Sequence, residues 1–294
     1  MKRTTGLLLT KMGMRACNNY YIHFPSTSYC DSIRYDEVTI VIRREFTREA
    51  VVKTIVDFMK QLDYVHALYE GGAIAFDRID EWSDIDLYIV VDDEKVNETF
   101  DAVEVALKSL APIKHKYSVP KLPWSSVSQS FYRLEQTSEY LLIDLAVIKL
   151  SSPEKFLEPH IHGKVVFYIN KSDEIKVPIM NKEELEENLA QKLAQLRDRF
   201  AVFNINVQKE INRGNYLEAL ILYNSITLGS VVDALRIKYN PFHHDFKTRY
   251  VQYELPKQIV RELQRLYFVR DITDLIKKYR EGTGWFYEIV KESF

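Results

Sequence analysis

Apolar residues recur with two different periods in the first half of the chain, and these periods predict its helices and strands. Residues 48–62 and 96–110 carry apolar side chains at helical spacing. Residues 64–69 and 85–91 are apolar runs of strand length. The first half of the chain is therefore expected to combine a sheet with helices packed against it.

Three further segments complete the predicted sheet. Residues 131–135 and 140–149 are expected to form a hairpin that turns through residues 136–139, and residues 164–169 are expected to form one more strand. A short strand is also predicted over residues 38–42.

Polar residues that can accept hydrogen bonds from backbone amides mark three helix starts. Thr47 is placed to cap the helix at 48–62, and Asp92 or Asp93 can cap the next helix. Asn181 and Glu184 stand three residues apart, a variant of the capping box, and predict another helix start.

The second half of the chain is predicted to be helical. Leucine and phenylalanine recur at steps of three and four after residue 181, up to a break at Gly214. Residues 216–239 are apolar nearly all round, as in a buried central helix, and residues 257–280 and 284–293 predict two more helices. We expect an α+β chain with a poorly patterned N-terminal leader (1–45), a mixed domain (46–180) and a helical domain (181–294).

Composition narrows the class of protein. The chain has 294 residues, a net charge of −2 and two cysteines, Cys17 and Cys30. Because it has no overall basic field, we do not expect nucleic acid as its partner. A disulfide framework is excluded, and no uninterrupted apolar run approaches the roughly 18 residues of a membrane span or forms a signal peptide. The sequence therefore predicts a cytoplasmic protein with no membrane partner, and it leaves the oligomeric state open.

A Gly-Gly pair precedes an Asp-Ile-Asp sequence by twelve residues. Side chains alternate faces along a strand, so Asp84 and Asp86 point the same way. Two adjacent carboxylates repel each other unless they are solvated or share divalent cations, and both alternatives are open for this motif alone. Gly71 and Gly72 close the strand before it, either as a plain turn or as a place where a phosphate approaches the backbone.

A third carboxylate and a local excess of acids strengthen the metal hypothesis. Asp144 lies inside an apolar strand, where an unpaired carboxylate is costly, so it needs a shared metal, backbone amides or an arginine such as Arg133. The segment from Glu70 to Lys95 holds nine acids against two bases. Such a patch attracts Mg²⁺ or a polyamine-like substrate, although part of it is expected to be a solvated rim.

The glycine pair, the Asp-x-Asp motif and the later Asp144 together resemble the nucleotidyltransferase superfamily with a DNA polymerase β-type palm. Within it, a mixed domain followed by a helical one resembles the aminoglycoside and streptomycin nucleotidyltransferases. The motifs cover residues 65–92 and, less closely, the chain to residue 170. Beyond residue 181 only the architecture is similar.

The resemblance implies a role for each motif residue. Asp84 and Asp86 would bind two Mg²⁺ ions that clamp a nucleoside triphosphate, and Asp144 would be a further metal ligand and the base for the incoming hydroxyl. Gly71 and Gly72 would seat the β- and γ-phosphates. Ala73 departs from the pattern, because such enzymes commonly carry a serine there, and the missing hydroxyl removes one phosphate contact worth about 1 kcal/mol.

The resemblance predicts an adenylyltransferase-like enzyme that moves AMP from ATP onto a hydroxyl of a small acceptor such as an aminoglycoside. Two alternatives remain open: a toxin–antitoxin-type nucleotidyltransferase that acts on a protein or RNA, and a degenerate nucleotide-binding module. Among other candidates, His160 and His162 would share one face if they lay on a strand, which would allow a metal there. Tyr88 has the same strand parity as Asp84 and Asp86 and is expected to border the site.

Overall fold

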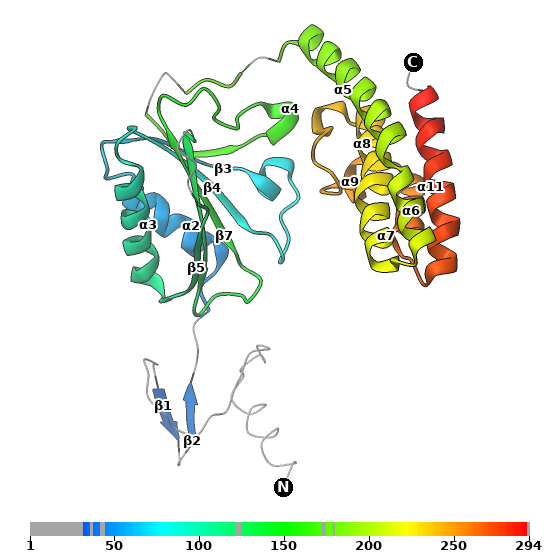
Figure 1. The fold of residues 1–294 in the computed structure, drawn as a ribbon. Coiled ribbons are helices and arrows are strands. Elements are labelled where there is room, and N and C mark those ends of the chain that lie inside the picture. The colour runs from blue at the N-terminus through cyan, green and yellow to red at the C-terminus, as the bar shows by residue number, and fades with distance from the viewer. Residues whose placement is uncertain are drawn as a thin grey trace. The chain divides into compact units, whose positions relative to one another are not determined.

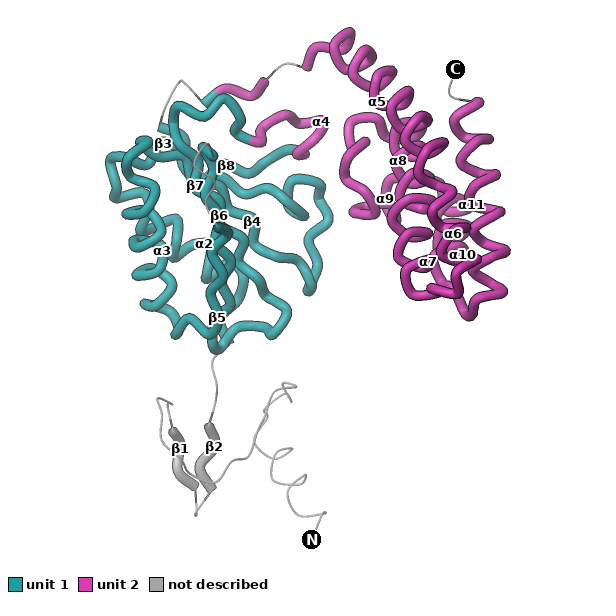
Figure 2. Tube along the Cα trace, in the orientation of Figure 1, with its two compact units in different colours: residues 1–155, 164–175 teal, residues 156–163, 176–294 magenta. Residues whose placement is uncertain are grey.

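The computed structural model describes residues 32–35, 38–41, 45–120, 125–171, 175–178 and 180–292. The predicted leader up to residue 31 and both cysteines lie outside this part of the chain. At its start, β1 (Ser32–Tyr35) and β2 (Val38–Val41) pair antiparallel, so the strand predicted at 38–42 is confirmed. The chain divides into two compact units, which we call the sheet unit (Met1–Lys155 and Lys164–Ile175) and the helical unit (Phe156–Gly163 and Lys176–Phe294) (Figure 2).

The described part of the sheet unit contains a six-stranded mixed sheet in the order β5-β6-β7-β4-β3-β8. Its central strands β4 and β7 run parallel, and the neighbouring pairs are antiparallel. The strands are β3 (Val65–Glu70), β4 (Ile85–Val91), β5 (Ile113–Ser118), β6 (Val127–Leu134), β7 (Ile143–Lys149) and β8 (Val166–Asn170). All were predicted except β5, and β6 begins earlier than expected.

Two helices of the sheet unit, α2 (Arg48–Met59) and α3 (Val96–Leu110), lie on the same side of the sheet (Figure 1). Thr47 caps α2 as predicted, because its side chain accepts from the Ala50 amide. The cap of α3 is Lys95, and the prediction of Asp92 or Asp93 was wrong. Those two carboxylates bind elsewhere, Asp92 to the His66 ring and Asp93 to Ser151.

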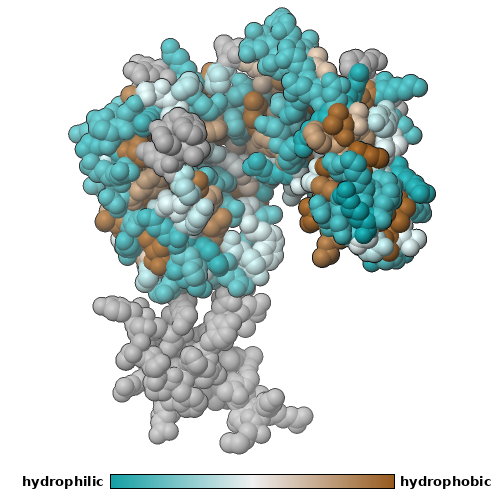
Figure 3. All heavy atoms as spheres, in the orientation of Figure 1, coloured by the Kyte–Doolittle hydropathy of each residue, from teal (hydrophilic) through white to brown (hydrophobic). Residues whose placement is uncertain are grey.

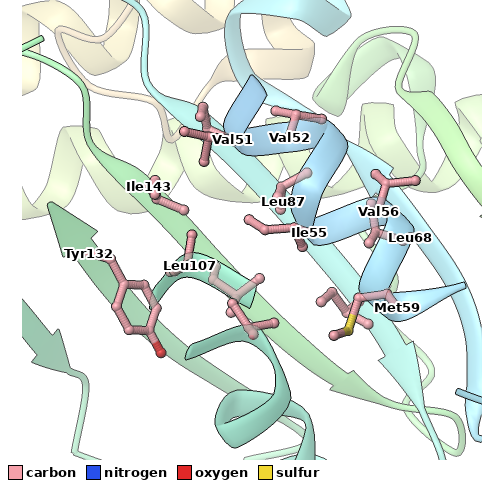
Figure 4. Close-up of a cluster of buried hydrophobic side chains, with 14 of the residues drawn as sticks. Val51, Val52, Ile55, Val56, Met59, Leu68, Leu87, Leu107, Tyr132 and Ile143 are labelled. Atoms are coloured by element: carbon pink, nitrogen blue, oxygen red, sulfur yellow. The ribbon is translucent and has the colours of Figure 1, made fainter. Parts of the chain in front are cut away.

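The hydrophobic core of the sheet unit lies between these helices and one face of the sheet (Figure 4). Alternate residues of β4 and β7 point into this core, as the period of two requires. The other face carries the intervening residues, and we call it the open face. Core residues drawn in the figure include Val51, Ile55, Met59, Leu87, Leu107, Tyr132 and Ile143.

The helical unit contains long helices that the sequence predicted with shifted ends. Asn181 caps α5 (Lys182–Phe203) as expected, and α6 (Ile205–Arg213) ends at Gly214. Residues 216–239 are helical throughout, as α7 (Tyr216–Leu222), the π-helical η2 (Tyr223–Leu228) and α8 (Gly229–Tyr239). The unit also contains α4 (Pro159–His162), η3 (Pro241–His243), α9 (Val251–Glu254), α10 (Lys257–Tyr267) and α11 (Ile272–Glu292).

The stretch Tyr216–Tyr239 is long and apolar enough to cross a membrane by length and composition, but 56% of its apolar 18-residue window is buried inside the structure. Its α8 part is a core element, with Val231 and Leu235 among its buried residues. Its α7 part leaves apolar side chains exposed, among them Leu217 and Ile221. Brown apolar areas on the surface of the helical unit are visible in Figure 3.

Candidate active site

Strand β4 and the residue before it place two of the predicted carboxylates. Ile85, Leu87 and Ile89 are buried in the core beneath the helices. The alternate residues Asp86 and Tyr88 therefore lie on the open face, where both are partly exposed. Asp84 immediately precedes β4, at the same end of the strand.

The third predicted carboxylate lies directly beside the second. Strand β7 pairs parallel with β4, and Asp144 is in register with Asp86. Neighbouring strands are about 4.8 Å apart, and paired residues point to the same face. The fold thus brings together Asp86 and Asp144, which are 58 positions apart in the sequence.

Burial and mutual repulsion change the acidity of these carboxyls. Burial, reinforced by the charges of Asp144 and Asp84, raises the pKa of Asp86 to about 6. Burial also raises the pKa of Asp84. The pKa of Asp144 is raised by burial and by Asp84, against the effect of a hydrogen bond from Gln129. Within the described residues no lysine or arginine forms an ion pair with any of the three, so their charges are left for a cation to neutralise.

The glycine pair is held against this acidic site. The Gly71 amide donates to the Asp86 carbonyl at 2.9 Å. Gly72 has φ +63°, and a Cβ there would lie 1.8 Å from the Asp86 Oδ2 atom, so only glycine fits. A Cβ on Gly71 would lie 3.0 Å from the Tyr88 ring. The two glycines therefore allow the backbone to lie very close to the Asp86 carboxylate, which a plain turn would not require.

The residues after the first glycine form η1 (Gly72–Phe76), a 3-10 helix. Ala73 lies within it, and its carbonyl accepts from the Arg78 amide at 2.9 Å. The alanine brings no side-chain hydroxyl to this turn, so a phosphate here would be contacted by backbone groups and by whatever metal accompanies it.

The partner of Asp144 is a residue that the sequence did not indicate. The Gln129 side-chain amide, on β6, donates to Asp144 Oδ1 at 2.7 Å. Arg133 instead donates to the backbone carbonyl of Glu139. Gln129 fixes one oxygen of Asp144 and carries no charge, so it orients the carboxylate without neutralising it.

A buried ion pair supports the Asp84 segment from the helix-covered face. Arg48, in the first turn of α2, pairs with Glu70, and the Tyr168 hydroxyl donates to the other Glu70 oxygen at 2.6 Å. Arg48 also donates to the Asp84 backbone carbonyl at 3.2 Å. Only the acid of this pair gives a signal in the sequence, because Glu70 ends an apolar strand and needs a cation, whereas nothing in the sequence indicates that Arg48 supplies it.

The oxygen ligands of this site suit a hard divalent cation such as Mg²⁺. Among the described residues no three His, Cys, Asp or Glu side chains stand close enough to hold one ion. Mg²⁺ is commonly bound by one or two carboxylates together with substrate phosphates and waters, without a complete protein cage. The Asp86–Asp144 pair and Asp84 fit that mode of binding, in which the nucleotide supplies the remaining oxygens.

The two histidines that would share one face of a strand lie in a helix instead. His160 and His162 lie in the single turn of α4 and not on a strand, because Pro159 and the capping side chain of Glu158 start a helix there. The two rings contact different partners: His160 stacks on Phe242, and His162 meets Phe156 edge to face. The proposed pairing of the two imidazoles on a strand face was wrong.

Comparisons with known proteins match solved nucleotidyltransferase structures. The chain is similar to an aminoglycoside 6-adenyltransferase from Bacillus subtilis, at 14% identity and TM-score 0.32, over 84% of this chain and 89% of that one. It is similar to a nucleotidyltransferase-like protein from Exiguobacterium sibiricum, at 12% identity and TM-score 0.36, over 84% and 75%.

A third similar structure is a STING-associated c-di-GMP synthase from Capnocytophaga granulosa, at 13% identity and TM-score 0.29, over 81% of each chain. No family model matches the chain, and no curated protein matches it. These three TM-scores are all below 0.5, so the carboxylates and glycines of the site are the evidence for function.

Proposed function

We propose that the protein is a Mg²⁺-dependent nucleotidyltransferase that transfers AMP from ATP to a hydroxyl of a small acceptor and releases pyrophosphate. One observation carries this proposal: Asp86 and Asp144 stand side by side on parallel strands, with no lysine or arginine of the described residues paired to them, while Gly72 is pressed against Asp86. Paired carboxylates beside a glycine turn are what a metal-bound triphosphate requires.

The reaction balances without a redox partner. The acceptor oxygen forms a bond to the α-phosphorus, the bond from that phosphorus to the bridging oxygen of the β-phosphate breaks, and pyrophosphate leaves. Each bound Mg²⁺ would be held by one or two of the carboxylates Asp84, Asp86 and Asp144 together with phosphate oxygens, and would supply electrostatic stabilisation of the charge on the phosphates.

The chain's own residues position the groups and accept the proton. Asp144 receives the proton of the acceptor hydroxyl, and its raised pKa makes it a better base than an ordinary aspartate. The hydrogen bond from Gln129 holds one Asp144 oxygen and leaves the other for this proton. Gly71 and Gly72 let the β- and γ-phosphates approach the backbone closely.

ATP as donor, an aminoglycoside-type acceptor and a cytoplasmic location belong to the proposal. The acidic sequence around the site supports a cationic acceptor, although some of its carboxylates are already paired with other residues of the chain. Asp92 and Asp93 are bound to His66 and Ser151, and Glu70 is paired with Arg48. Asp80 and Glu81 remain as exposed acids in the loop before Asp84.

The test is pyrophosphate release from each nucleoside triphosphate with Mg²⁺ over a panel of aminoglycosides and other hydroxylated compounds. Acceptor-dependent release is expected from the wild type, with a loss of at least about a hundredfold in Asp84→Asn and Asp86→Asn. Circular dichroism of the variants controls for folding. Release that persists in both variants would refute the site. Tight nucleotide binding without any release would mean that the acceptor is outside the panel, and the absence of both would favour a degenerate module.

A further inference from the structure

A row of four side chains crosses the open face at the level of the proposed catalytic carboxylates. Tyr117 on β5 is in register with Phe131 on β6, which is in register with Asp144 on β7, and Asp144 with Asp86. Residues in register point to the same face of a sheet. With strands about 4.8 Å apart, Phe131 lies about 5 Å and Tyr117 about 10 Å from Asp144 along the row.

The two aromatic residues of the row form a stacked pair that the core does not use. Their ring centroids are 6.3 Å apart with an interplanar angle of 24°. Tyr117 is 60% exposed, and Phe131 is partly exposed. The adjacent residues Lys116 and Tyr132 point to the opposite face, where Lys116 pairs with Glu104 of α3. The open face therefore presents an aromatic surface beside Asp144, the proposed base.

A second aromatic pair borders the same carboxylates. Trp82 precedes Asp84 by two residues, Tyr140 precedes Asp144 by four, and their rings meet edge to face with centroids 4.7 Å apart. Both side chains are more than half exposed. Because β4 and β7 are parallel, this pair lies at the end of the strands where Asp84 and Asp86 are found.

The two aromatic pairs have different charged neighbours. Next to Tyr117 and Phe131, the pair in register on the same face is His115 and Arg133, and the acids lie beside the second aromatic pair. Asp80, Glu81 and Glu139 are exposed next to the second aromatic pair. The nearby cation Arg133 donates to the Glu139 carbonyl. Exposed aromatic rings among carboxylates bind cationic groups through the ring faces and through charge.

We propose that Tyr117 and Phe131 form the acceptor subsite, which holds a hydroxylated ring bearing ammonium groups so that one hydroxyl reaches Asp144. This inference rests on the proposed function. The spacing along the row suits an acceptor with one ring over Phe131 and a neighbouring ring over Tyr117. The nucleotide then occupies the other side of Asp144, by Asp86 and the glycines.

The test measures equilibrium binding of kanamycin, streptomycin and spectinomycin, and separately of Mg²⁺–ATP, to the full chain. The variants are Tyr117→Ala, Tyr117→Phe and, as a control of similar exposure on α3, Val105→Ala, since Val105 is 58% exposed. Tyr117→Ala is expected to weaken, at least about tenfold, the binding of whichever of the three compounds the wild type binds. Its binding of Mg²⁺–ATP is expected to stay within about twofold of the wild type. Tyr117→Phe keeps the ring, so it and Val105→Ala are expected to bind like the wild type.

Each other outcome overturns the inference in a distinguishable way. If Tyr117→Ala binds that compound as tightly as the wild type does, the rings do not hold the acceptor. Weakened Mg²⁺–ATP binding alone would assign the aromatic pair to the nucleotide. If the wild type binds Mg²⁺–ATP but none of the three compounds, the aminated acceptor is wrong and the proposed transferase stands. If it binds neither, the proposed function fails as well.

Discussion

Gly72 shows how a single residue determines the proposed site. Its positive φ and its contact with the Asp86 carboxylate leave no room for a side chain. Gly214, at the end of α6, has a similar φ of +76°, but a Cβ at that position would meet nothing within 4 Å. Comparing the same substitution at the two glycines therefore separates the effect of backbone strain from the effect of steric overlap with Asp86.

We predict that Gly72→Ala displaces the Asp86 carboxylate and reduces transferase activity by at least about a hundredfold. Gly214→Ala carries only the cost of a left-handed alanine, about 1–2 kcal/mol, and is expected to keep its activity. Activity assays and urea denaturation of both variants check this. Equal activities would contradict the role of Gly72.

At this scale the sequence identified the acids and glycines, but not the residues that support them. Asp84, Asp86 and Asp144 stand out because they are carboxylates within or immediately before apolar strands. Gln129 and Arg48 have no such signal, since a glutamine or an arginine near a strand or helix start is ordinary. Their roles depend on which strand or helix packs beside them, which the fold alone determines.

At the scale of elements, the buried Arg48–Glu70 pair joins α2, β3 and the Asp84 backbone. We predict that Arg48→Met lowers the free energy of unfolding by about 3–5 kcal/mol, because it leaves a buried carboxylate without its partner. Lys53→Ala, which removes an exposed pair with Asp57 on the same helix, is expected to cost less than about 1 kcal/mol. Urea denaturation measures both.

The double variant Arg48→Met with Glu70→Gln provides the control for this prediction. Removing both charges is expected to recover a large part of the lost stability, because no unpaired buried charge remains. Additive losses in the single and double variants would show that the pair is not coupled.

The elements that sequence patterns missed have physical explanations. Strand β5 is at the edge of the sheet and mostly exposed, so it lacks an apolar period. The break predicted near residue 281 lies instead between α10 and α11, where Asp271 accepts from the Asp274 amide. Gly282 does not end a helix; it packs against the Thr227 side chain, where a Cβ would lie 3.2 Å away.

At the scale of the whole molecule, the segment Phe156–Gly163 belongs to the helical unit although it lies between two strands of the sheet. The His243 ring contacts the Ile161 carbonyl at 3.0 Å and the Glu254 carboxylate at 2.9 Å within that unit. Sequence patterns place boundaries where the period changes. They cannot show that a short excursion between strands packs with a distant part of the chain.

The acidity of the site links metal binding to pH. Asp86 has a pKa raised from 3.8 to about 6, so the folded chain holds this proton more tightly than the unfolded chain. At pH values above about 6 the ionised Asp86 therefore lowers the free energy of unfolding of the metal-free chain. This loss is recovered as the pH falls toward 3.8, because the carboxyl becomes protonated in the folded chain first. A bound cation reverses the preference, because it favours the ionised carboxylate.

The most direct test of the central claim is binding of Mn²⁺ in the presence of ATP, measured at about pH 7.5 and about pH 5. Mn²⁺ prefers the same oxygen ligands as Mg²⁺. We predict binding about tenfold weaker at the lower pH, where a proton occupies Asp86, and the loss of both tight binding and this pH dependence in Asp86→Asn. Asp57→Asn, on the surface of α2, is the control. Equal Mn²⁺ affinity in the wild type and Asp86→Asn would contradict the account.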